Sequence, residues 1–305
     1  MNILVTGSTG FLGKCLCRAL QAQGHQVIPS SSKTCNLQNA DSLNQFNKER
    51  FDQIYHLAVW TQAGDFCMHH PGEQWVINQK INTNMLDWWQ RKQPQAKMIS
   101  IGTSCAFDPI YPLDEEHYLA GTPIESLVGY GMTKRMLLCG LQALQKQYGL
   151  DYLFLIPSTL YGIDGYHNDG KQLHFIFDVV KKILRGKFYG EPVVLWGDGE
   201  QKREIIHVDD FVSTMIELVE KTKNEVINIG AGKEHSIKEF ALMACQAGNF
   251  PFTKIEFDTR RYVGAKSKVL LIEKLLKMNS SFNSRDPTIG IKELVDWLSE
   301  HPTLL

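Results

Sequence analysis

Apolar and polar positions alternate along the first half of the chain in a repeating strand-then-helix pattern. Short β-branched and aliphatic runs predict five strands, at 2–6, 26–29, 53–58, 97–102 and 152–157. Apolar residues at helical spacing predict four helices between them, at 14–23, 41–49, 72–91 and 126–148. Strands that alternate with helices indicate an α/β fold, a doubly wound parallel sheet of the Rossmann type with helices on both faces.

The pattern loosens in the second half. We expect a polar loop over 162–170, then a helix over about 172–185 and a strand near 226–229. The residues Ser236-Ile-Lys-Glu239 have the form of a capping box, which predicts that a helix begins there.

No low-complexity linker or internal repeat separates the two halves. We therefore expect a smaller C-terminal lobe built from excursions of the same chain. The predicted domains are a dinucleotide-binding Rossmann domain at 1–165, with later returns of the chain near 204–230, and a substrate lobe formed mainly by 166–305.

The first predicted strand runs directly into a glycine-rich turn with the spacing G-x-x-G-x-x-G. Glycines let the backbone turn sharply and approach a pyrophosphate, whose charge is favoured by the N–H groups at a helix start. The turn therefore predicts a dinucleotide site formed by Gly7, Thr9, Gly10, Phe11, Leu12 and Gly13. The alternative is that the glycines only allow the helix to pack tightly on the strand.

Composition and charge exclude several classes of partner. The chain has 305 residues, 43% of them apolar, and a net charge of −1, which gives no electrostatic case for nucleic acid or an anionic membrane. The strand at residue 2 leaves no room for a signal peptide, and no apolar run spans a membrane, so we expect a cytoplasmic protein. The seven scattered cysteines contain no C-x-x-C pair and predict neither disulfides nor a metal site, so most are expected to be small buried residues.

Tyr130 and Lys134 are four residues apart in the predicted helix 126–148 and so share one of its faces. An ammonium beside a phenol lowers the pKa of the tyrosine, which suits a proton donor working near neutral pH. The alternative is an exposed lysine that packs its stem along a tyrosine. Thr103 ends the fourth predicted strand, where ligands bind in doubly wound sheets, although its hydroxyl is equally suited to cap nearby backbone.

Taken together, these motifs resemble the extended short-chain dehydrogenase/reductase family, NAD(P)-dependent enzymes that act mostly on nucleotide sugars. The matching residues also include Tyr55-His-Leu-Ala58, Pro157-Ser-Thr-Leu-Tyr-Gly162, and Arg203 before His207-Val-Asp-Asp210. The resemblance implies that Thr103, Tyr130 and Lys134 form a catalytic trio and that the substrate is a nucleotide sugar. It also implies further cofactor contacts from Leu57, Ala58, Pro157, Thr159 and Leu160.

The turn after the second strand, Pro29-Ser-Ser-Ser-Lys33, has no acid that would bind both hydroxyls of an adenosine ribose. Its serines and lysine suit a 2′-phosphate, so Ser31 and Lys33 favour NADP(H) over NAD(H). The alternative is an ordinary polar turn with a solvated Lys33.

Within the family, Cys105 makes the chain similar to GDP-L-fucose synthase-like enzymes, which epimerise GDP-4-keto-6-deoxymannose at C3 and C5 and reduce C4 with NADPH. That resemblance implies that Cys105 and His174 are the base and acid of epimerisation. A thiolate can remove a proton next to a ketone, and a neighbouring imidazolium or the positive nicotinamide would lower the thiol pKa. The alternative is that Cys105 is a small buried residue and His174 an ordinary helix residue.

The substrate itself is left open by three departures from that pattern: the loop 163–170, the segment 64–70, and Thr9 in place of an arginine. A retained fold with altered loops indicates the same reaction class on another sugar or nucleotide. Candidate substrate residues are Arg203 as a pyrophosphate anchor, Lys268 as a weaker candidate for the same charge, and Trp196 in a Trp-Gly segment that resembles the family's.

Three functions compete. The first is an epimerase/reductase, or a 4-keto reductase without epimerisation, and the second is a C4 epimerase that retains its cofactor. The third, a nucleotide-binding protein without turnover, is disfavoured because such a protein has no use for the proton donor Tyr130. The resemblance further implies a homodimer formed through the helices at 72–91 and 126–148.

Overall fold

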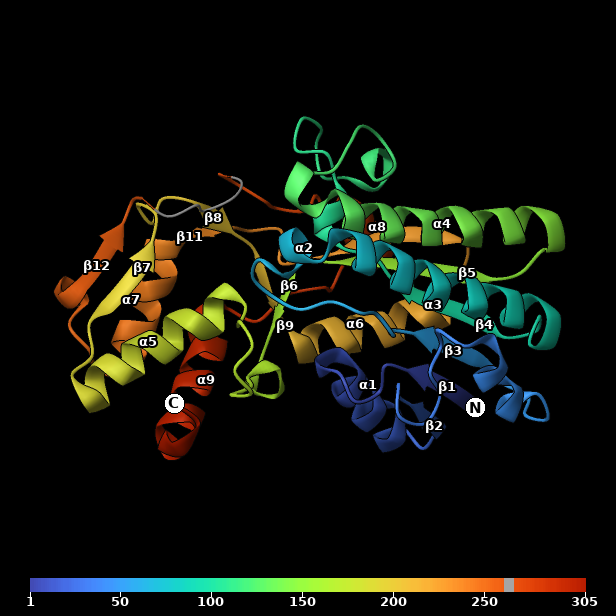
Figure 1. The fold of residues 1–305 in the computed structure, drawn as a ribbon, viewed down its shortest axis with the longest axis horizontal. Coiled ribbons are helices and arrows are strands. Elements are labelled where there is room, and N and C mark those ends of the chain that lie inside the picture. Colours follow the sequence, from blue (N-terminus) through green and yellow to red (C-terminus); the bar gives the residue numbers. More distant parts are fainter. Residues whose placement is uncertain (261–265) are drawn as a thin grey trace.

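A computed structural model of the chain describes residues 1–260 and 266–305. Its largest sheet has six parallel strands in the order β10-β5-β4-β3-β1-β2. The strands are β1 (Asn2–Thr6), β2 (Gln26–Ser30), β3 (Gln53–His56), β4 (Lys97–Ile101), β5 (Tyr152–Pro157) and β10 (Glu225–Ile229). Helices cover both faces of this sheet (Figure 1). The predicted doubly wound α/β fold is therefore confirmed.

Each face of the sheet is covered by a pair of helices. On one face, α3 (Pro71–Lys92) and α4 (Val128–Tyr148) bury Met85, Trp89 and Leu138 in one apolar cluster. On the other face, α1 (Phe11–Ala22) and α6 (Val208–Lys221) bury Leu16 and Phe211 in a second cluster. The apolar stripe of each helix thus faces the sheet. Within the described residues, no helix combines the length and apolar character that crossing a membrane requires.

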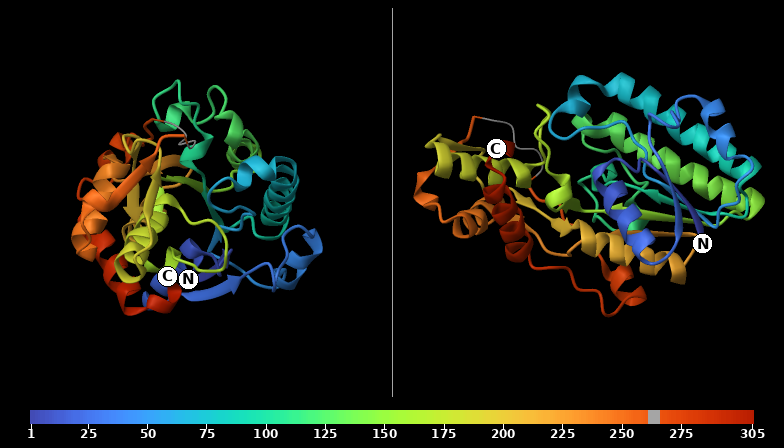
Figure 2. Two further views of the ribbon diagram at one scale, coloured as in Figure 1. Left: turned by 60° about the vertical axis from the view of Figure 1, so that its left-hand side comes forward. Right: turned by 90° about the horizontal axis from the view of Figure 1, so that it is seen from below.

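A third apolar cluster forms the core of the C-terminal lobe, which lies beside the sheet (Figure 2). Residues such as Phe177, Phe240 and Leu294 fill it, from the helices α5 (Phe175–Tyr189), α7 (Ile237–Gly248) and α9 (Pro287–Glu300). The short helices are α2 (Phe66–His69) and α8 (Glu273–Met278). Three strand pairs complete the chain: β6 (Thr159–Tyr161) with β9 (Ile205–His207), β7 (Val193–Trp196) with β12 (Ile255–Asp258), and β8 (Lys202–Arg203) with β11 (His235–Ser236).

One difference from the sequence-based expectation has a local cause. The helix predicted over 41–49 is wrong, because the segment Ala40–Phe46 forms a 3-10 helix. Its buried residues Leu43 and Phe46 are three positions apart, which is the period of a 3-10 turn. The capping box is confirmed: Ser236 Oγ accepts from Glu239 N at 3.1 Å, and Glu239 Oε2 accepts from Ser236 N at 2.6 Å.

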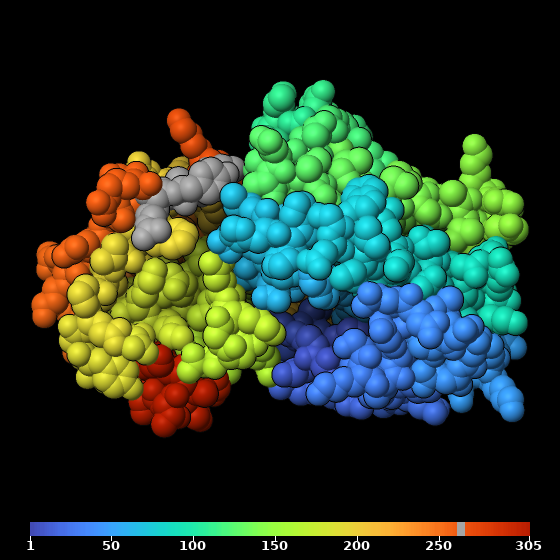
Figure 3. All heavy atoms as spheres, in the orientation of Figure 1, coloured from blue at the N-terminus to red at the C-terminus, as the bar shows by residue number. Residues whose placement is uncertain are grey.

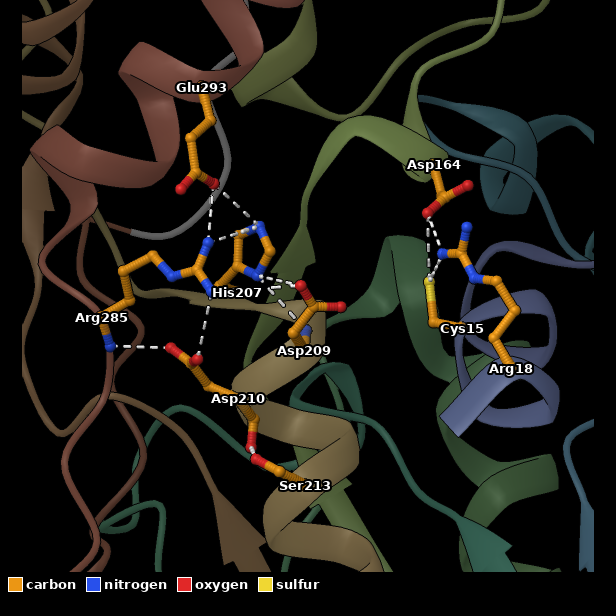
Figure 4. A network of polar contacts seen from close by, with 9 residues as sticks. All are labelled: Cys15, Arg18, Asp164, His207, Asp209, Asp210, Ser213, Arg285 and Glu293. Carbon is orange, nitrogen blue, oxygen red and sulfur yellow. Dashed lines mark hydrogen bonds and ion pairs between the residues drawn. The ribbon is translucent and has the colours of Figure 1, made fainter. Parts of the chain in front are cut away.

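Two polar networks join the lobe to the sheet (Figure 4). In the first, Arg18 of α1 forms an ion pair with Asp164, from the loop after β6. In the second, Arg285 donates to Glu293 of α9 at 2.6 Å and to the ring of His207, at the start of α6, at 3.4 Å. These contacts hold the lobe against the sheet.

Candidate active site

At two positions of the glycine turn, the neighbouring backbone lies too close for any side chain. Gly7 has φ of +68°, and a Cβ there would lie 2.9 Å from the Ala58 nitrogen. A Cβ at Gly13 would lie 2.3 Å from the Gly7 oxygen. No side chain caps α1, whose N-cap is Gly10, so its first N–H groups remain available to an anion. The turn therefore fits a dinucleotide pyrophosphate, with Leu57 and Ala58 directly beside it.

The turn after β2 lies next to the glycine turn, because Ser8 N and Oγ both donate to Ser30 O at 3.0 Å. The following turn is closed by Cys35 N, which donates to Ser31 O at 2.7 Å, and Lys33 on it is exposed. Residues 29–40 contain no acid. Serine hydroxyls and an exposed ammonium fit the 2′-phosphate that distinguishes NADP(H).

Thr103, Tyr130 and Lys134 meet at the carboxyl end of β4. Lys134 Nζ donates to Ile101 O at 2.8 Å, and the Tyr130 hydroxyl is hydrogen-bonded to the Thr103 side chain. Thr103 Oγ1 also accepts from Cys105 N at 3.2 Å and so caps a 3-10 turn. The capping role and the site position considered for Thr103 are therefore both present in the structure.

The expected effect of the lysine on the tyrosine is corrected by the structure. Burial, together with the nearby thiols of Cys105 and Cys67, raises the pKa of Tyr130 above its ordinary value. Burial also lowers the pKa of Lys134 to about 8. The reason is that the Lys134 ammonium is directed to the Ile101 carbonyl and that both groups are removed from water. Tyr130 is consequently held as a protonated donor.

Cys105 lies under the ammonium of a residue that is distant in the sequence. Lys268 Nζ donates to Cys105 Sγ at 3.4 Å. Burial opposes ionisation of this thiol, but the charge of Lys268, the hydrogen bonds from Thr103 and Lys268, and the charge of Arg203 together lower the pKa of Cys105. Lysine and arginine thus supply the positive charge that we expected from an imidazolium or the nicotinamide.

His174 is the N-cap residue of α5 and is exposed at the edge of the lobe. Two residues earlier, Gln172 Oε1 accepts from Asp65 N at 2.9 Å, which brings the start of α5 to the segment after β3. Figure 3 shows these two segments and the N-terminal residues meeting around a hollow. Desolvation by the surrounding protein, then the charges of Lys268 and His167, lower the pKa of His174.

The other predicted substrate and cofactor residues lie on strands around this site or on the lobe. Arg203 is in β8, paired with His235, and its charge acts on Cys105. Pro157 ends β5, while Thr159 and Leu160 belong to β6, and Leu160 packs on an apolar cluster. The Trp196 ring is exposed at the end of β7, with Lys182 Nζ 5.8 Å from its centroid.

Three further residues lie in the site without having been predicted. Tyr118 is fully buried, and its hydroxyl accepts from Thr103 N at 3.3 Å. Cys67 is buried within electrostatic reach of Tyr130 and Cys105. Glu204 is 2% exposed beside Arg203. Only Glu204 left a signal in the sequence, because a carboxylate directly before the apolar pair Ile205-Ile206 is unusual in a buried strand.

Comparison with known proteins places this geometry among nucleotide-sugar enzymes. The model of the NAD dependent epimerase/dehydratase family matches residues 3–230. The chain is 26% identical to GDP-L-fucose synthase 1 of Arabidopsis thaliana over 307 residues, which cover 97% of this chain and 92% of the relative. It is 24% identical to the GDP-L-fucose synthase of Escherichia coli over 318 residues, or 98% and 97% of the two chains.

A solved structure agrees with this likeness. The GDP-L-fucose synthetase of Naegleria fowleri bound to NADP superimposes with a TM-score of 0.84 at 25% sequence identity. The match covers 99% of this chain and 95% of the other.

Proposed function

Because this chain belongs to the NAD dependent epimerase/dehydratase family, as the sequence predicted, we propose that it is an NADPH-dependent epimerase/reductase of a nucleotide-linked 4-keto deoxysugar. The relatives named GDP-L-fucose synthase support a GDP-sugar, and the NADP-bound synthetase supports NADP(H). The observation that carries the proposal is the Cys105 thiol held 3.4 Å from the Lys268 ammonium, beside Thr103 and Tyr130. One cleft therefore combines a base for C–H bonds with a proton donor for an oxygen.

The epimerisation step uses the thiol side of the cleft. The Cys105 thiolate removes the proton from C3 or C5, where the adjacent C4 ketone takes up the electron pair as an enolate oxygen. The His174 ring, once it has taken up a proton from solvent, donates that proton to the opposite face of the same carbon, which inverts the configuration. Proton exchange with solvent returns both side chains to their starting forms, so no atoms or electrons are gained overall.

The reduction step uses the α4 side. The glycine turn would hold NADPH, and its nicotinamide would supply the hydride for C4. Tyr130 donates its hydroxyl proton to the C4 oxygen as that oxygen gains charge, and the Thr103 hydroxyl orients the same oxygen. The Lys134 ammonium, which donates to Ile101 O while Tyr130 is neutral, would supply positive charge on the same helix face as a tyrosinate forms. Its charge is present below a pKa of about 8.

Arg203 and Lys268 are proposed to meet the substrate pyrophosphate, with Trp196 toward the rest of the nucleotide. We also propose a homodimer through α3 and α4, because Trp75, Val76 and Met136 on these helices are exposed. We also propose that the protein is cytoplasmic, because its seven cysteines are free thiols and the cytoplasm keeps thiols reduced.

Two measurements in solution test these proposals. Light scattering tests the dimer, and thermal stabilisation by GDP, UDP, CDP or dTDP identifies the nucleotide base of the substrate.

The function is tested by mixing the purified chain with NADPH and GDP-4-keto-6-deoxymannose in deuterated water. We expect loss of NADPH absorbance and deuterium at C3 and C5 of the product. Reduction without deuterium at either carbon identifies a 4-keto reductase and removes the epimerase role of Cys105 and His174. Unchanged NADPH absorbance with this substrate, and with the 4-keto sugar of whichever nucleotide stabilises the protein, rejects the reductase.

A further inference from the structure

A buried carboxylate joins three segments of the chain behind the thiol. Glu204 connects β8 to β9 and is 2% exposed. Its Oε1 accepts from Gly232 N at 2.7 Å, and its Oε2 accepts from Leu270 N at 2.9 Å. The N–H of Ala231 adds a further hydrogen bond. The carboxylate thus ties the segments 230–232 and 268–270 to the strand that carries Arg203.

The geometry around this carboxylate is close-fitting. A Cβ on Gly230 would lie 2.3 Å from Glu204 Oε1. Within the described residues, its hydrogen-bond partners are backbone N–H donors, so the side chain binds them as an acceptor. Burial raises the pKa of Glu204 to about 7, and these N–H groups and the charge of Lys268 oppose that shift. A carboxamide would turn one of its own N–H groups toward a backbone N–H and lose one of these hydrogen bonds.

The tied segments carry the two cations that act on Cys105. Lys268 lies two residues before Leu270, and Arg203 directly precedes Glu204. Lys268 Nζ is 3.4 Å from Cys105 Sγ. We propose that Glu204 is a positioning residue whose carboxylate anchors the Lys268–Leu270 segment and thereby holds the Lys268 ammonium against the Cys105 sulfur. Its importance for catalysis rests on the proposed function, in which Cys105 is the base.

The sign of the effect separates positioning from simple electrostatics. A negative charge near a thiol disfavours the thiolate. Removing the Glu204 charge without moving Lys268 would therefore increase the thiolate fraction of Cys105. If Glu204 instead holds Lys268 in place, its removal lets the ammonium move away, and the thiolate fraction decreases.

The test measures the alkylation rate of Cys105 by iodoacetamide between pH 6 and 10, by mass spectrometry of the peptide that contains it. We expect Glu204→Gln and Lys268→Met each to raise the apparent pKa of Cys105 by about one unit. The alkylation rate at pH 7 then falls about tenfold. The double variant should match Lys268→Met alone, because Glu204 acts through Lys268. Glu200→Gln is the matched control, since Glu200 is exposed and bonds Lys238.

An unchanged or lowered pKa of Cys105 in Glu204→Gln overturns the proposal, as does a full additional effect of Glu204→Gln in the Lys268→Met background. If Glu204→Gln does not fold, Glu204→Asp tests the proposal instead. Aspartate keeps two acceptor oxygens, but its side chain is one methylene shorter and cannot reach both backbone N–H groups as closely. We expect it to raise the pKa of Cys105, and an unchanged value rejects positioning. Alkylation needs no sugar substrate, so these outcomes are independent of whether the reductase assay succeeds.

Discussion

Two halves of the site differ in how the protein shifts their pKa values: the α4 side, formed by Tyr130 and Lys134, and the thiol side, formed by Cys105 and Lys268. On the α4 side, Tyr130 and Lys134 come from one helix turn, yet burial dominates and shifts both pKa values toward the neutral forms. On the thiol side, Cys105 and Lys268 are 163 residues apart in the sequence, yet they lie 3.4 Å apart. The charge and hydrogen bond of Lys268, together with Thr103 and Arg203, outweigh burial and lower the pKa of Cys105. Sequence proximity therefore did not determine which pair is electrostatically coupled.

This difference assigns complementary tasks to the two sides. A tyrosine held in its protonated form suits a proton donor, and a thiol with a lowered pKa suits a base. Environments that push the two pKa values apart allow one cleft to remove a proton from carbon and deliver another to oxygen.

The largest expected effect is a loss of one reaction step, and not the other, when one side of the site is mutated. Tyr130→Phe should lower the rate of C4 reduction on the order of 10²–10⁴-fold, because the proton donor is removed. Cys105→Ser should lower deuterium exchange at C3 and C5 by a similar factor, because a serine hydroxyl is not ionised near pH 7. Single-turnover assays with the 4-keto substrate and with its epimerised form measure the two steps separately.

Each variant serves as the control for the other. Cys105→Ser should retain reduction of the epimerised substrate, and Tyr130→Phe should retain exchange. If either substitution abolishes both steps while NADPH binding persists, the division between the α4 side and the thiol side is wrong.

The next effect is an opposite pH dependence of the two steps. Reduction should fall about tenfold per pH unit as pH rises well above 8, because Lys134, with a pKa of about 8, loses its charge. Exchange by Cys105 should rise with pH until the thiol is ionised, at a pH below the ordinary thiol value. Rate profiles between pH 5.5 and 9.5 in constant-ionic-strength buffers check both directions. Profiles that rise and fall together contradict the assignment.

A smaller effect concerns the stability of the α4 side. His56 is 1% exposed and bonds Thr6 Oγ1 at 3.2 Å and Asn82 Oδ1 at 3.1 Å. Burial lowers the pKa of His56 to about 4, although the Asn82 bond opposes this shift. The unfolded chain therefore binds a proton between pH 6.5 and 4 that the native state does not. The free energy of unfolding should fall by about 1–2 kcal/mol from pH 7 to pH 5.

Urea denaturation at both pH values measures this change. In His56→Gln the contribution of this ring to the pH dependence should disappear, whereas His301→Gln, at an exposed position after α9, should keep the wild-type dependence. An identical pH dependence in His56→Gln and the wild type would show that the ring is not held neutral.

Local patterns predicted much of the fold. The bounds of β1 and β5 agree with the apolar runs, and the capping box marks the start of α7. By contrast, α6 and α9 were not predicted, although α6 carries acids in its first turn and a strong apolar stripe. The run Arg203–Asp210 was interpreted as a functional motif, and the start of α6 at Val208 lies inside it.

The sequence by itself determined the elements that depend on neighbouring residues. The glycine turn, the strand alternation and the placing of Thr103, Tyr130 and Lys134 at one sheet edge follow from local spacing and from the parallel topology. Only the tertiary structure decided that Lys268 contacts Cys105 and that Glu204 accepts a hydrogen bond from Leu270 N. These contacts join segments 66 and 163 residues apart. Their electrostatics depend on burial and distance, which no single segment contains.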